Sequence, residues 1–231
     1  MLKNSDCIIL NSRKYSESSK IISVYSKTYG KISLMAKGAY SNKSKFLGLL
    51  ETSYIIDAEF YFKENRDLHT LSNADIKYRY RNAKSDFRLL TCAMICCEIT
   101  NKSQSVGEVN PDLYYDLEST LKSIDEGIGL YNCLIYLNKV ISYLGFQIMI
   151  DENLDREGKI KFNMNNGTFN SESGFFIYKN EFSVVENMIN NISLDIDIDL
   201  ELFNKIYSFM IRYLSIHIEK HININSLELL I

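Results

Sequence analysis

The chain has 231 residues, of which 46% are hydrophobic and 24% are charged, and its formal net charge is −3. This composition excludes an intrinsically disordered chain and predicts one large domain or two smaller ones with hydrophobic cores. The five cysteines show no paired spacing and no run of about 18 uncharged apolar residues occurs, so we expect a soluble protein of the reducing cytoplasm that does not enter a membrane.

The first 80 residues contain five short runs rich in Ile, Tyr and Phe, which predict β-strands. These runs cover residues 6–14, 20–28, 31–38, 53–62 and 67–74. Five antiparallel strands in so short a segment are typical of a small β-barrel of the OB type. The predicted fold class is therefore α+β, with an OB-type barrel over residues 1–80 and a helical domain over residues 81–231.

The second and third runs are predicted to form a β-hairpin around Tyr29 and Gly30, because glycine adopts the positive φ of a tight turn. Apolar and polar side chains alternate along residues 31–37. One face of this strand should enter the core, and the other should present lysines to solvent.

Positive charge is concentrated at the start of the chain. Residues 1–50 carry a net charge of +7, whereas residues 91–231 carry −10. Such asymmetry indicates a polyanionic partner for the basic segment. The alternative is a solvated lysine face that only keeps the barrel soluble.

We interpret the basic residues as contacts to a phosphate backbone and the aromatic rings among them as stacking platforms for bases. The candidate phosphate contacts are Arg13, Lys14, Lys20, Lys27, Lys31, Lys37, Lys43 and Lys45, and the candidate stacking rings are Tyr15, Tyr25, Tyr40 and Phe46. Lys20, Lys31 and Lys37 are the leading contacts on a single outer wall of the barrel.

Beyond residue 80 the hydrophobic period becomes helical. Residues 86–100 predict a helix with an apolar stripe that includes Phe87 and Met94. Asn110 and Pro111 predict the start of the next helix, because asparagine caps helices and proline suits the first turn. Further helices are predicted over residues 128–144, 181–192 and 200–221, with Gly145 as a left-handed cap after the first of these. Residues 150–180 interrupt the pattern with Gly, Asn and Ser around two short β-like segments, which predicts an inserted β-ribbon.

Several residue groups imitate metal sites. Cys92, Cys96 and Cys97 lack further ligands and are predicted to pack as small hydrophobic residues. His217 and His221 share a helix face but lack the HExxH order of a zinc site. Asp195, Asp197 and Asp199 fail as a calcium loop, since Leu200 and Ile206 stand where glycine and glutamate are required, so an acidic helix cap is the expectation.

Enzymatic motifs are missing from the sequence. No phosphate-binding loop, dinucleotide-binding glycine turn or nucleophile elbow occurs, and His69 is a lone strand histidine that we expect to be packed or exposed. We therefore expect no catalytic residues, no cofactor and no bound metal.

The segment SRKYSESSKIISVYSKTYGKISLMAKGA, residues 12–39, followed by KSKFLGLLE, residues 43–51, resembles the bacterial recombination mediator family RecO. The likeness lies in the ordered motifs Y-x-E-x-x-K, Y-G-K, A-K-G-A and K-S-[RK]-F. Weaker likeness in NPDLYYDLE, residues 110–118, and SYLGF, residues 142–146, extends it over most of the chain.

This resemblance implies an OB barrel on a helical domain and a role in DNA repair and homologous recombination. It implies binding of single- and double-stranded DNA, annealing of complementary strands coated by single-strand-binding protein, and cooperation with RecR in loading the recombinase RecA. Lys102, Lys122 and Lys139 are scarce cations of the acidic helical region and are candidate contacts for the acidic C-terminal tail of single-strand-binding protein. The alternatives are ordinary helix-surface lysines and, for the whole chain, a protein-binding adaptor with little DNA affinity.

One feature departs from the family pattern. Many family members carry two C-x-x-C pairs that bind zinc in the insertion after the LGF-like segment, but residues 150–180 contain no cysteine. We expect a metal-free ribbon held by side-chain packing.

Overall fold

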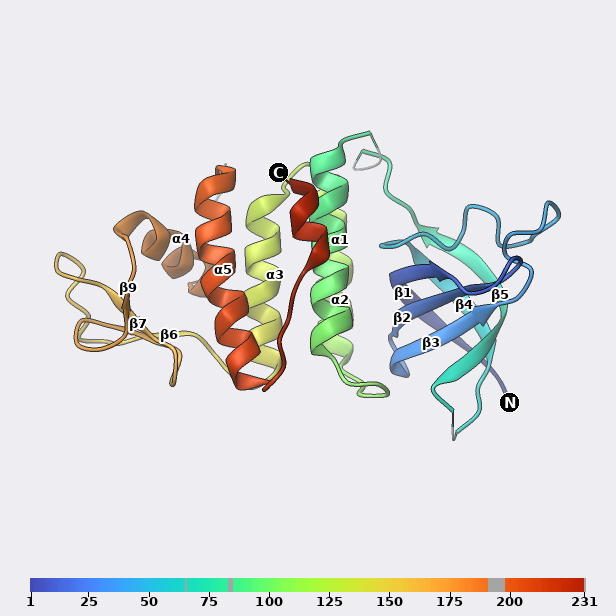
Figure 1. The fold of residues 1–231 in the computed structure, drawn as a ribbon, viewed down its shortest axis with the longest axis horizontal. Helices are drawn as coiled ribbons and strands as arrows, with labels where there is room; N and C mark the ends of the chain where they lie inside the picture. Colours follow the sequence, from blue (N-terminus) through green and yellow to red (C-terminus); the bar gives the residue numbers. More distant parts are fainter. Residues whose placement is uncertain (65, 83–84, 191–197, 231) are drawn as a thin grey trace. The chain divides into compact units, whose positions relative to one another are not determined.

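The computed structural model describes residues 1–64, 66–82, 85–190 and 198–230 (Figure 1). The chain divides into two compact units. Unit 1 consists of Met1–Gly129 with Ile224–Ile231, and unit 2 consists of Leu130–Asn223. The expected domain boundary at residue 80 falls inside unit 1, because the barrel packs with the first two helices. None of the described helices is long and apolar enough to span a membrane.

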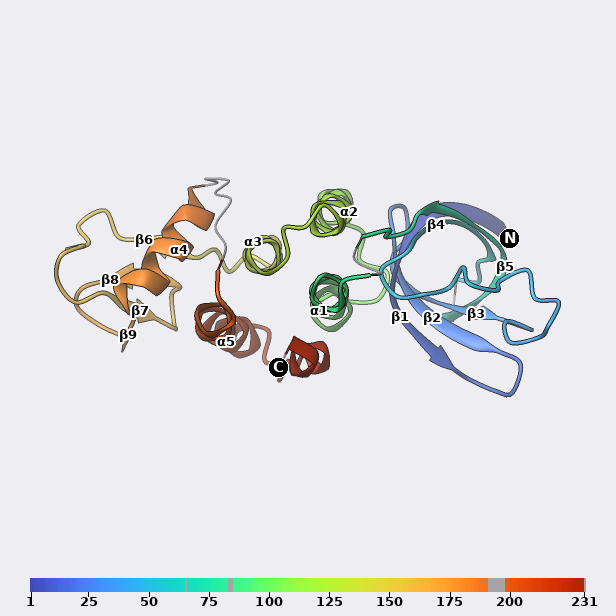
Figure 2. The same cartoon turned by 90° about the horizontal axis from the view of Figure 1, so that it is seen from above.

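A closed five-stranded barrel begins unit 1 and appears as a ring in Figure 2. Its strands are β1 (Leu2–Lys14), β2 (Lys20–Ser26), β3 (Gly30–Ala36), β4 (Ile55–Tyr61) and β5 (Leu68–Tyr78). Around the barrel they follow the order β1-β2-β3-β5-β4, antiparallel at each described pairing except β3 with β5. The predicted OB-type barrel is confirmed. The first strand starts earlier than predicted, because Leu2 pairs with Tyr61 of β4.

The predicted alternation along β3 is confirmed, and β4 shows the same pattern from Ile56 onward. In β3, Ile32 and Leu34 are buried while Ser33 between them is partly exposed. In β4, Ala58 and Phe60 are fully buried. Burial of every second side chain is what a strand in a closed barrel requires, since only one face lines the interior.

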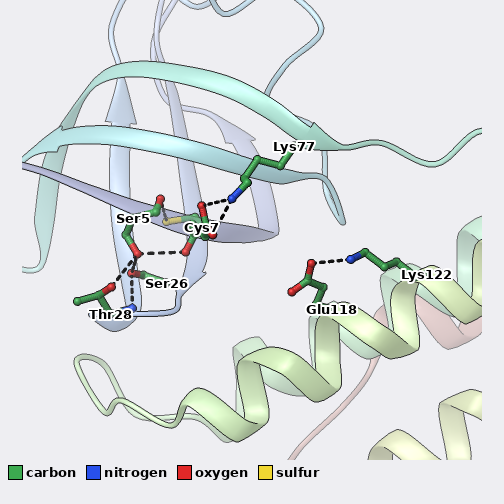
Figure 3. Close-up of polar contacts among 8 residues, drawn as sticks. Ser5, Cys7, Ser26, Thr28, Lys77, Glu118 and Lys122 are labelled. Atoms are coloured by element: carbon green, nitrogen blue, oxygen red, sulfur yellow. Dashed lines mark hydrogen bonds and ion pairs between the residues drawn. The ribbon is translucent and has the colours of Figure 1, made fainter.

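The hairpin turn between β2 and β3 is held by a buried serine (Figure 3). The Ser26 hydroxyl accepts hydrogen bonds from the amides of Thr28, at 3.3 Å, and Tyr29, at 3.0 Å. The same hydroxyl donates to Ser5 Oγ of β1 at 2.8 Å. Gly30 ends the turn with φ of +63°, as predicted, and a Cβ at this position would collide with the carbonyl group of Glu108.

Replacement of Gly30 by alanine is expected to destabilise the protein by about 3 kcal/mol, because it adds backbone strain to a steric clash. Gly38→Ala is the matched control, since Gly38 has φ of +71° but open space around it. The control should cost only about 1 kcal/mol. Urea unfolding of both variants measures the difference. Equal losses in the free energy of unfolding would show that the Glu108 backbone moves to accommodate the added methyl group.

Two helices complete most of unit 1. The helix α1 (Phe87–Ser103) begins where the Asp86 carboxylate accepts from the amides of Arg88 and Leu89, and α2 (Pro111–Asp125) is capped by Asn110, as predicted. The predicted apolar stripe on α1 is wrong, since Phe87 is 63% exposed and Met94 is only partly buried. Buried side chains instead surround much of the helix, because the barrel and other helices pack on several of its sides.

The three cysteines of α1 are fully buried and pack in the core, as expected. Burial raises the pKa of the Cys97 thiol to about 12, so the thiol stays protonated. A protonated, buried thiol is a poor nucleophile and a poor metal ligand.

A buried carboxylate joins the barrel to α2. Asp125 accepts hydrogen bonds from the Tyr78 hydroxyl at 2.9 Å and from the amides of Arg81 and Asn82. Burial, together with this carboxylate, raises the pKa of Tyr78 to about 12. The connection from β5 to α1 is thereby fixed to the end of α2.

A second carboxylate anchors the C-terminal segment, a short helix η1 (Asn225–Leu230), to α1. Glu98 accepts from the amides of Asn225 and Ser226 and from the Ser226 hydroxyl at 2.7 Å. Burial acts to raise the pKa of the Glu98 carboxyl, but these donors and Lys102 outweigh it, so the pKa is lowered. The carboxylate therefore remains charged at neutral pH.

Unit 2 combines three helices with a small sheet. Its helices are α3 (Leu130–Tyr143), α4 (Lys179–Ile189) and α5 (Leu200–His217). Its strands are β6 (Met149–Ile150), β7 (Lys161–Asn163), β8 (Thr168–Asn170) and β9 (Phe175–Phe176), in the order β6-β8-β7-β9. The inserted ribbon thus has four strands where two segments were predicted. The helix α5 ends at His217 and not at residue 221, because Glu219 has a positive φ of 51°.

Aromatic packing holds the inserted sheet to α5. The Phe162 ring lies 4.7 Å from Phe169 of the neighbouring strand and 5.4 Å from Phe209 and Tyr213 of α5, measured between ring centroids. His217 adds contacts of its ring nitrogens to the carbonyl oxygens of Tyr213 and Asn165. Side-chain packing therefore holds the inserted sheet to α5, as predicted for the ribbon.

Within the described residues no group of three or more His, Cys, Asp or Glu side chains is arranged to hold a metal ion. Asp199 caps α5 by accepting from the amide of Leu202 at 2.8 Å, as predicted for an acidic helix start. Asp195 and Asp197, and the predicted end of α4 at residues 191–192, lie outside the described residues.

Candidate nucleic-acid interface

Two connections of the barrel meet at one of its ends. Lys14 at the end of β1 pairs with Lys20 at the start of β2, and Lys20 pairs with Ala36 at the end of β3. The connection after β3 contacts the β1–β2 connection, since the Tyr40 amide donates to the Ser18 carbonyl at 3.1 Å. It returns to the same place at Leu50, whose carbonyl accepts from Lys20 Nζ at 3.2 Å.

These two connections carry most of the predicted phosphate contacts. We call their six cations the basic end; they are Arg13, Lys14, Lys20, Lys37, Lys43 and Lys45. The carboxylates of the same two segments are Glu17 and Glu51. Positive charge therefore prevails at this end of the barrel, although the chain as a whole is acidic.

Tyr40 lies between two of these cations. Its ring centroid is 5.8 Å from Lys14 Nζ and 5.7 Å from Lys20 Nζ, and the residue is 44% exposed. Ammonium groups over an aromatic face gain a cation–π attraction, which orients the ring. An exposed, oriented ring flanked by cations has the chemistry needed to stack on a base while the adjacent phosphates are neutralised.

The residues of the basic end differ in exposure and in ion pairing. Lys20 forms an ion pair with Glu51 at 3.1 Å, which offsets part of its charge. Tyr15 is well exposed in the β1–β2 connection. Arg13, Lys14, Lys37, Lys43 and Lys45 are exposed.

Two predicted stacking rings are not available to a base. Tyr25 is 0% exposed and Phe46 is 5% exposed. The Tyr25 hydroxyl donates to the Asn110 carbonyl at 3.5 Å, and Lys45 Nζ lies over the Phe46 ring at 5.3 Å. Both rings serve the core of unit 1, so their assignment as stacking platforms was wrong.

The predicted single basic wall was also wrong, because the end of α1 packs on the outer face of the hairpin. Lys31 Nζ donates to the Asn101 carbonyl of α1 at 2.8 Å, and Ser23 Oγ donates to Asn101 Oδ1. Lys27 lies beyond the far end of β2, where its Nζ is 4.8 Å from the centroid of the Tyr115 ring of α2. Interaction with Tyr115 raises the pKa of Lys27. Lys27 and Lys31 therefore face the helices and do not belong to the basic end.

Two of the three lysines predicted to receive an acidic tail form ion pairs within their own helices. Lys102 pairs with Glu98 and Lys122 with Glu118, each one helical turn earlier (Figure 3 for Lys122). Each lysine is in the last turn of its helix, and α1 and α2 run antiparallel (Figure 1), so the two lysines lie at opposite ends of the helix pair. Lys139 belongs to unit 2. The structure favours the alternative reading, in which Lys102 and Lys122 are ordinary helix-surface lysines.

Comparison with known proteins gives two family matches. The family model for the N-terminal part of recombination protein O matches residues 1–80, and the model for its C-terminal part matches residues 84–223. The chain belongs to the RecO family. The resemblance seen in the sequence is thereby confirmed.

Curated relatives carry the same family name. The DNA repair protein RecO of Clostridium acetobutylicum is 30% identical over 164 residues, which cover 70% of this chain and 64% of the relative. That of Bacillus mycoides is 28% identical over 152 residues, covering 65% and 60%. That of Clostridium perfringens is 27% identical over 229 residues, covering 91% and 92%. The chain thus spans about 60% of the length of the first relatives it matches and nearly all of another.

Three of the four RecO-like motifs in the sequence lie at the basic end. Y-x-E-x-x-K forms the β1–β2 connection from Tyr15 to Lys20, while A-K-G-A and K-S-[RK]-F lie in the connection after β3. The remaining motif, Y-G-K, contains Gly30 and serves the hairpin turn. Sequence reasoning missed Glu51 as the ion-pair partner of Lys20, since nothing in the local pattern brings these residues together.

Proposed function

We propose that this chain binds DNA through the basic end of its barrel, anneals complementary strands and acts as a mediator of homologous recombination in DNA repair. The observation that carries the proposal is the exposed Tyr40 ring held between Lys14 and Lys20 among four further cations. Membership of the RecO family and the names of the curated relatives support the same role.

The proposed mechanism is electrostatic. Two DNA strands repel each other through their phosphates, and lysines that neutralise these charges release counterions and lower the repulsion. Stacking on Tyr40 holds a strand with its bases accessible. Annealing in this scheme needs no nucleotide hydrolysis, because pairing of the bases provides the free energy. Duplex DNA binds the same cations through its backbone.

The proposed partners follow from the family. RecR and the C-terminal tail of single-strand-binding protein are proposed as direct partners, and RecA as an indirect one that is loaded onto the exposed strand. The acidic region of the chain, with a net charge of −10 over residues 91–231, is better suited to protein partners than to DNA.

An annealing assay tests this proposal. Two complementary fluorescent oligonucleotides, each coated with single-strand-binding protein, are mixed with and without the chain. We expect annealing to accelerate strongly at low salt and to slow steeply as salt increases, because phosphate contacts are screened. Unchanged annealing would contradict the proposal. Retention of single-strand-binding protein without any DNA binding would favour the adaptor function.

A further inference from the structure

A cavity of about 370 Å³ lies in unit 1 beside the turn that joins β2 to β3. Its walls come from this turn with Ile32, from the described residues between Phe62 and His69, and from Val106, Gly107 and Val109. The cavity is distinct from the basic end, which lies at the other end of the hairpin. Its volume falls within the range of roughly 300–1,000 Å³ that is usual for small-ligand sites.

Three aromatic rings line this cavity. The rings of Phe62 and His69 are stacked, with centroids 4.5 Å apart and an interplanar angle of 26°. The Tyr29 ring lies 5.1 Å from Phe62 at 31°. Phe62 contacts both other rings, so a flat aromatic ligand would stack on a ring face that these contacts leave open.

His69 supplies a hydrogen-bond donor inside the cavity. The residue is 4% exposed, and its Nδ1 accepts from the amide of Lys63 at 3.3 Å. Burial lowers the pKa of His69, so the ring is neutral at pH 7 and carries its proton on Nε2. No described residue pairs with this N–H. The Nε2 atom is not fully buried, so its N–H is open to the cavity, where a ligand acceptor can take the place of water.

Charged groups complete the lining. Glu64 and Asp67 provide carboxylate acceptors from the β4–β5 connection, and Arg66 provides a guanidinium group between them in sequence. The site therefore offers an aromatic wall, one neutral N–H donor, two carboxylates and one cation. Two carboxylates against one guanidinium group make the lining acidic, so a ligand that carries hydrogen-bond donors fits it better than a bare phosphate does.

Guanine has the complementary pattern. It is a flat ring system with acceptors at O6 and N7, and with the adjacent donors N1–H and the 2-amino group. A carboxylate accepts from both donors, while the His69 N–H reaches an acceptor. Adenine, cytosine and thymine do not present a pair of adjacent donors next to an acceptor, and a 5′-phosphate on the nucleotide would suit Arg66.

We infer that this cavity, which we call the aromatic cavity, binds an unpaired guanine base. The base has two possible sources, a single DNA strand or a free guanine nucleotide. For the strand as source the inference rests on the proposed function; for the free nucleotide it does not.

Binding measurements with the full chain test the inference. The probes are oligo-dT strands that carry one central guanine, adenine or hypoxanthine, together with free GMP and AMP. We expect the strand with guanine to bind at least about 10-fold tighter than the strand with adenine, since one matched base contact discriminates by about that factor. Hypoxanthine lacks the 2-amino group and should fall between them. Tighter binding of GMP than AMP would identify the free nucleotide as a ligand.

Two variants assign the preference to the aromatic cavity. Asp67→Asn and His69→Phe should each abolish the preference for guanine, and Asp75→Asn should leave it intact, because Asp75 is an exposed carboxylate on β5 outside the cavity. Thermal unfolding checks that each variant folds. If His69→Phe does not fold, Asp67→Asn alone decides, since its side chain is exposed and keeps its shape.

The outcomes separate this inference from the proposed function. Loss of DNA binding on mutation of the basic end, with GMP binding intact, would leave the aromatic cavity supported. DNA binding without any preference for guanine, and no difference between GMP and AMP, would overturn the inference and leave the proposed function standing. A preference for guanine that survives Asp67→Asn would also overturn the assignment to this cavity.

Discussion

Reversing the charge of Lys14, Lys37 and Lys43 to glutamate should weaken the binding of single-stranded DNA by about 100-fold or more at moderate salt. All three side chains are exposed, and none forms an ion pair with a described residue. Each change removes a phosphate contact and adds a repulsive charge. Lys31 is omitted because its ammonium group is bound to the Asn101 carbonyl, so its replacement would disturb α1 packing.

Salt titration gives this prediction a second measurement. Six phosphate contacts on a single strand correspond to a log–log slope of about −4, and the triple variant should reduce it to about −2. The thermal midpoint should hardly change, because exposed, unpaired charges contribute little to stability. Fluorescence anisotropy with labelled oligo-dT between 50 and 200 mM salt, roughly the range over which such contacts are screened, measures both quantities.

The matched control carries the same change in net charge elsewhere. Lys159, Lys179 and Lys205 are exposed lysines of unit 2, and their replacement by glutamate should leave the salt slope unchanged. Equal losses in the two triple variants would mean that net charge, and not the basic end, governs binding. In that case the assignment of the site would be wrong while the family membership would stand.

The barrel strands were predictable because each leaves a pattern in neighbouring residues of the sequence. Alternation of apolar and polar residues identified the inward face of β3, and Gly30 marked the turn. Alternation does not reveal what covers the outward face of a strand. Tyr25 lies on that face, and only the packing of α1 and α2 explains why its ring is buried.

Helix starts were likewise predictable, since Asp86 and Asn110 act through their nearest neighbours. The inserted sheet was less so, because β6 and β8 are strands of only two and three residues whose parallel pairing depends on contacts between distant segments. The aromatic cavity was missed for the same reason. His69 is packed, as one of its two expected states, but the Tyr29 ring that lines the same cavity comes from a different turn of the barrel.

The fold also decides which of the predicted cations belong to the basic end. The sequence placed eight cations in one segment, and the structure divides them according to which end of the hairpin they occupy. Lys14 and Lys20 surround Tyr40 because their strands pair directly, whereas Lys27 lies against α2. Net charge alone does not make this distinction, because it requires the strand register.

Tyr40→Ala should reduce affinity for single-stranded DNA by about 5- to 100-fold and leave affinity for duplex DNA unchanged. Stacking of one base on an aromatic ring contributes about 1–3 kcal/mol, and bases inside a duplex are not available to the ring. Tyr40→Phe should bind like the wild type, because it retains the aromatic face and loses only a hydroxyl. Parallel titrations with oligo-dT and with a hairpin duplex of equal charge measure the ratio.

Tyr115→Ala is the matched control for this prediction. Tyr115 is 49% exposed and lies beside Lys27, so it shares the exposure and the neighbouring ammonium group of Tyr40 but belongs to α2. Its loss should affect neither ligand. If Tyr40→Ala weakens single-strand and duplex binding equally, Tyr40 only orients Lys14 and Lys20. The basic end then binds phosphates without stacking on a base. If Tyr40→Ala changes neither, strands bind through the lysines of the connection after β3, and the stacking step of the proposed mechanism is removed.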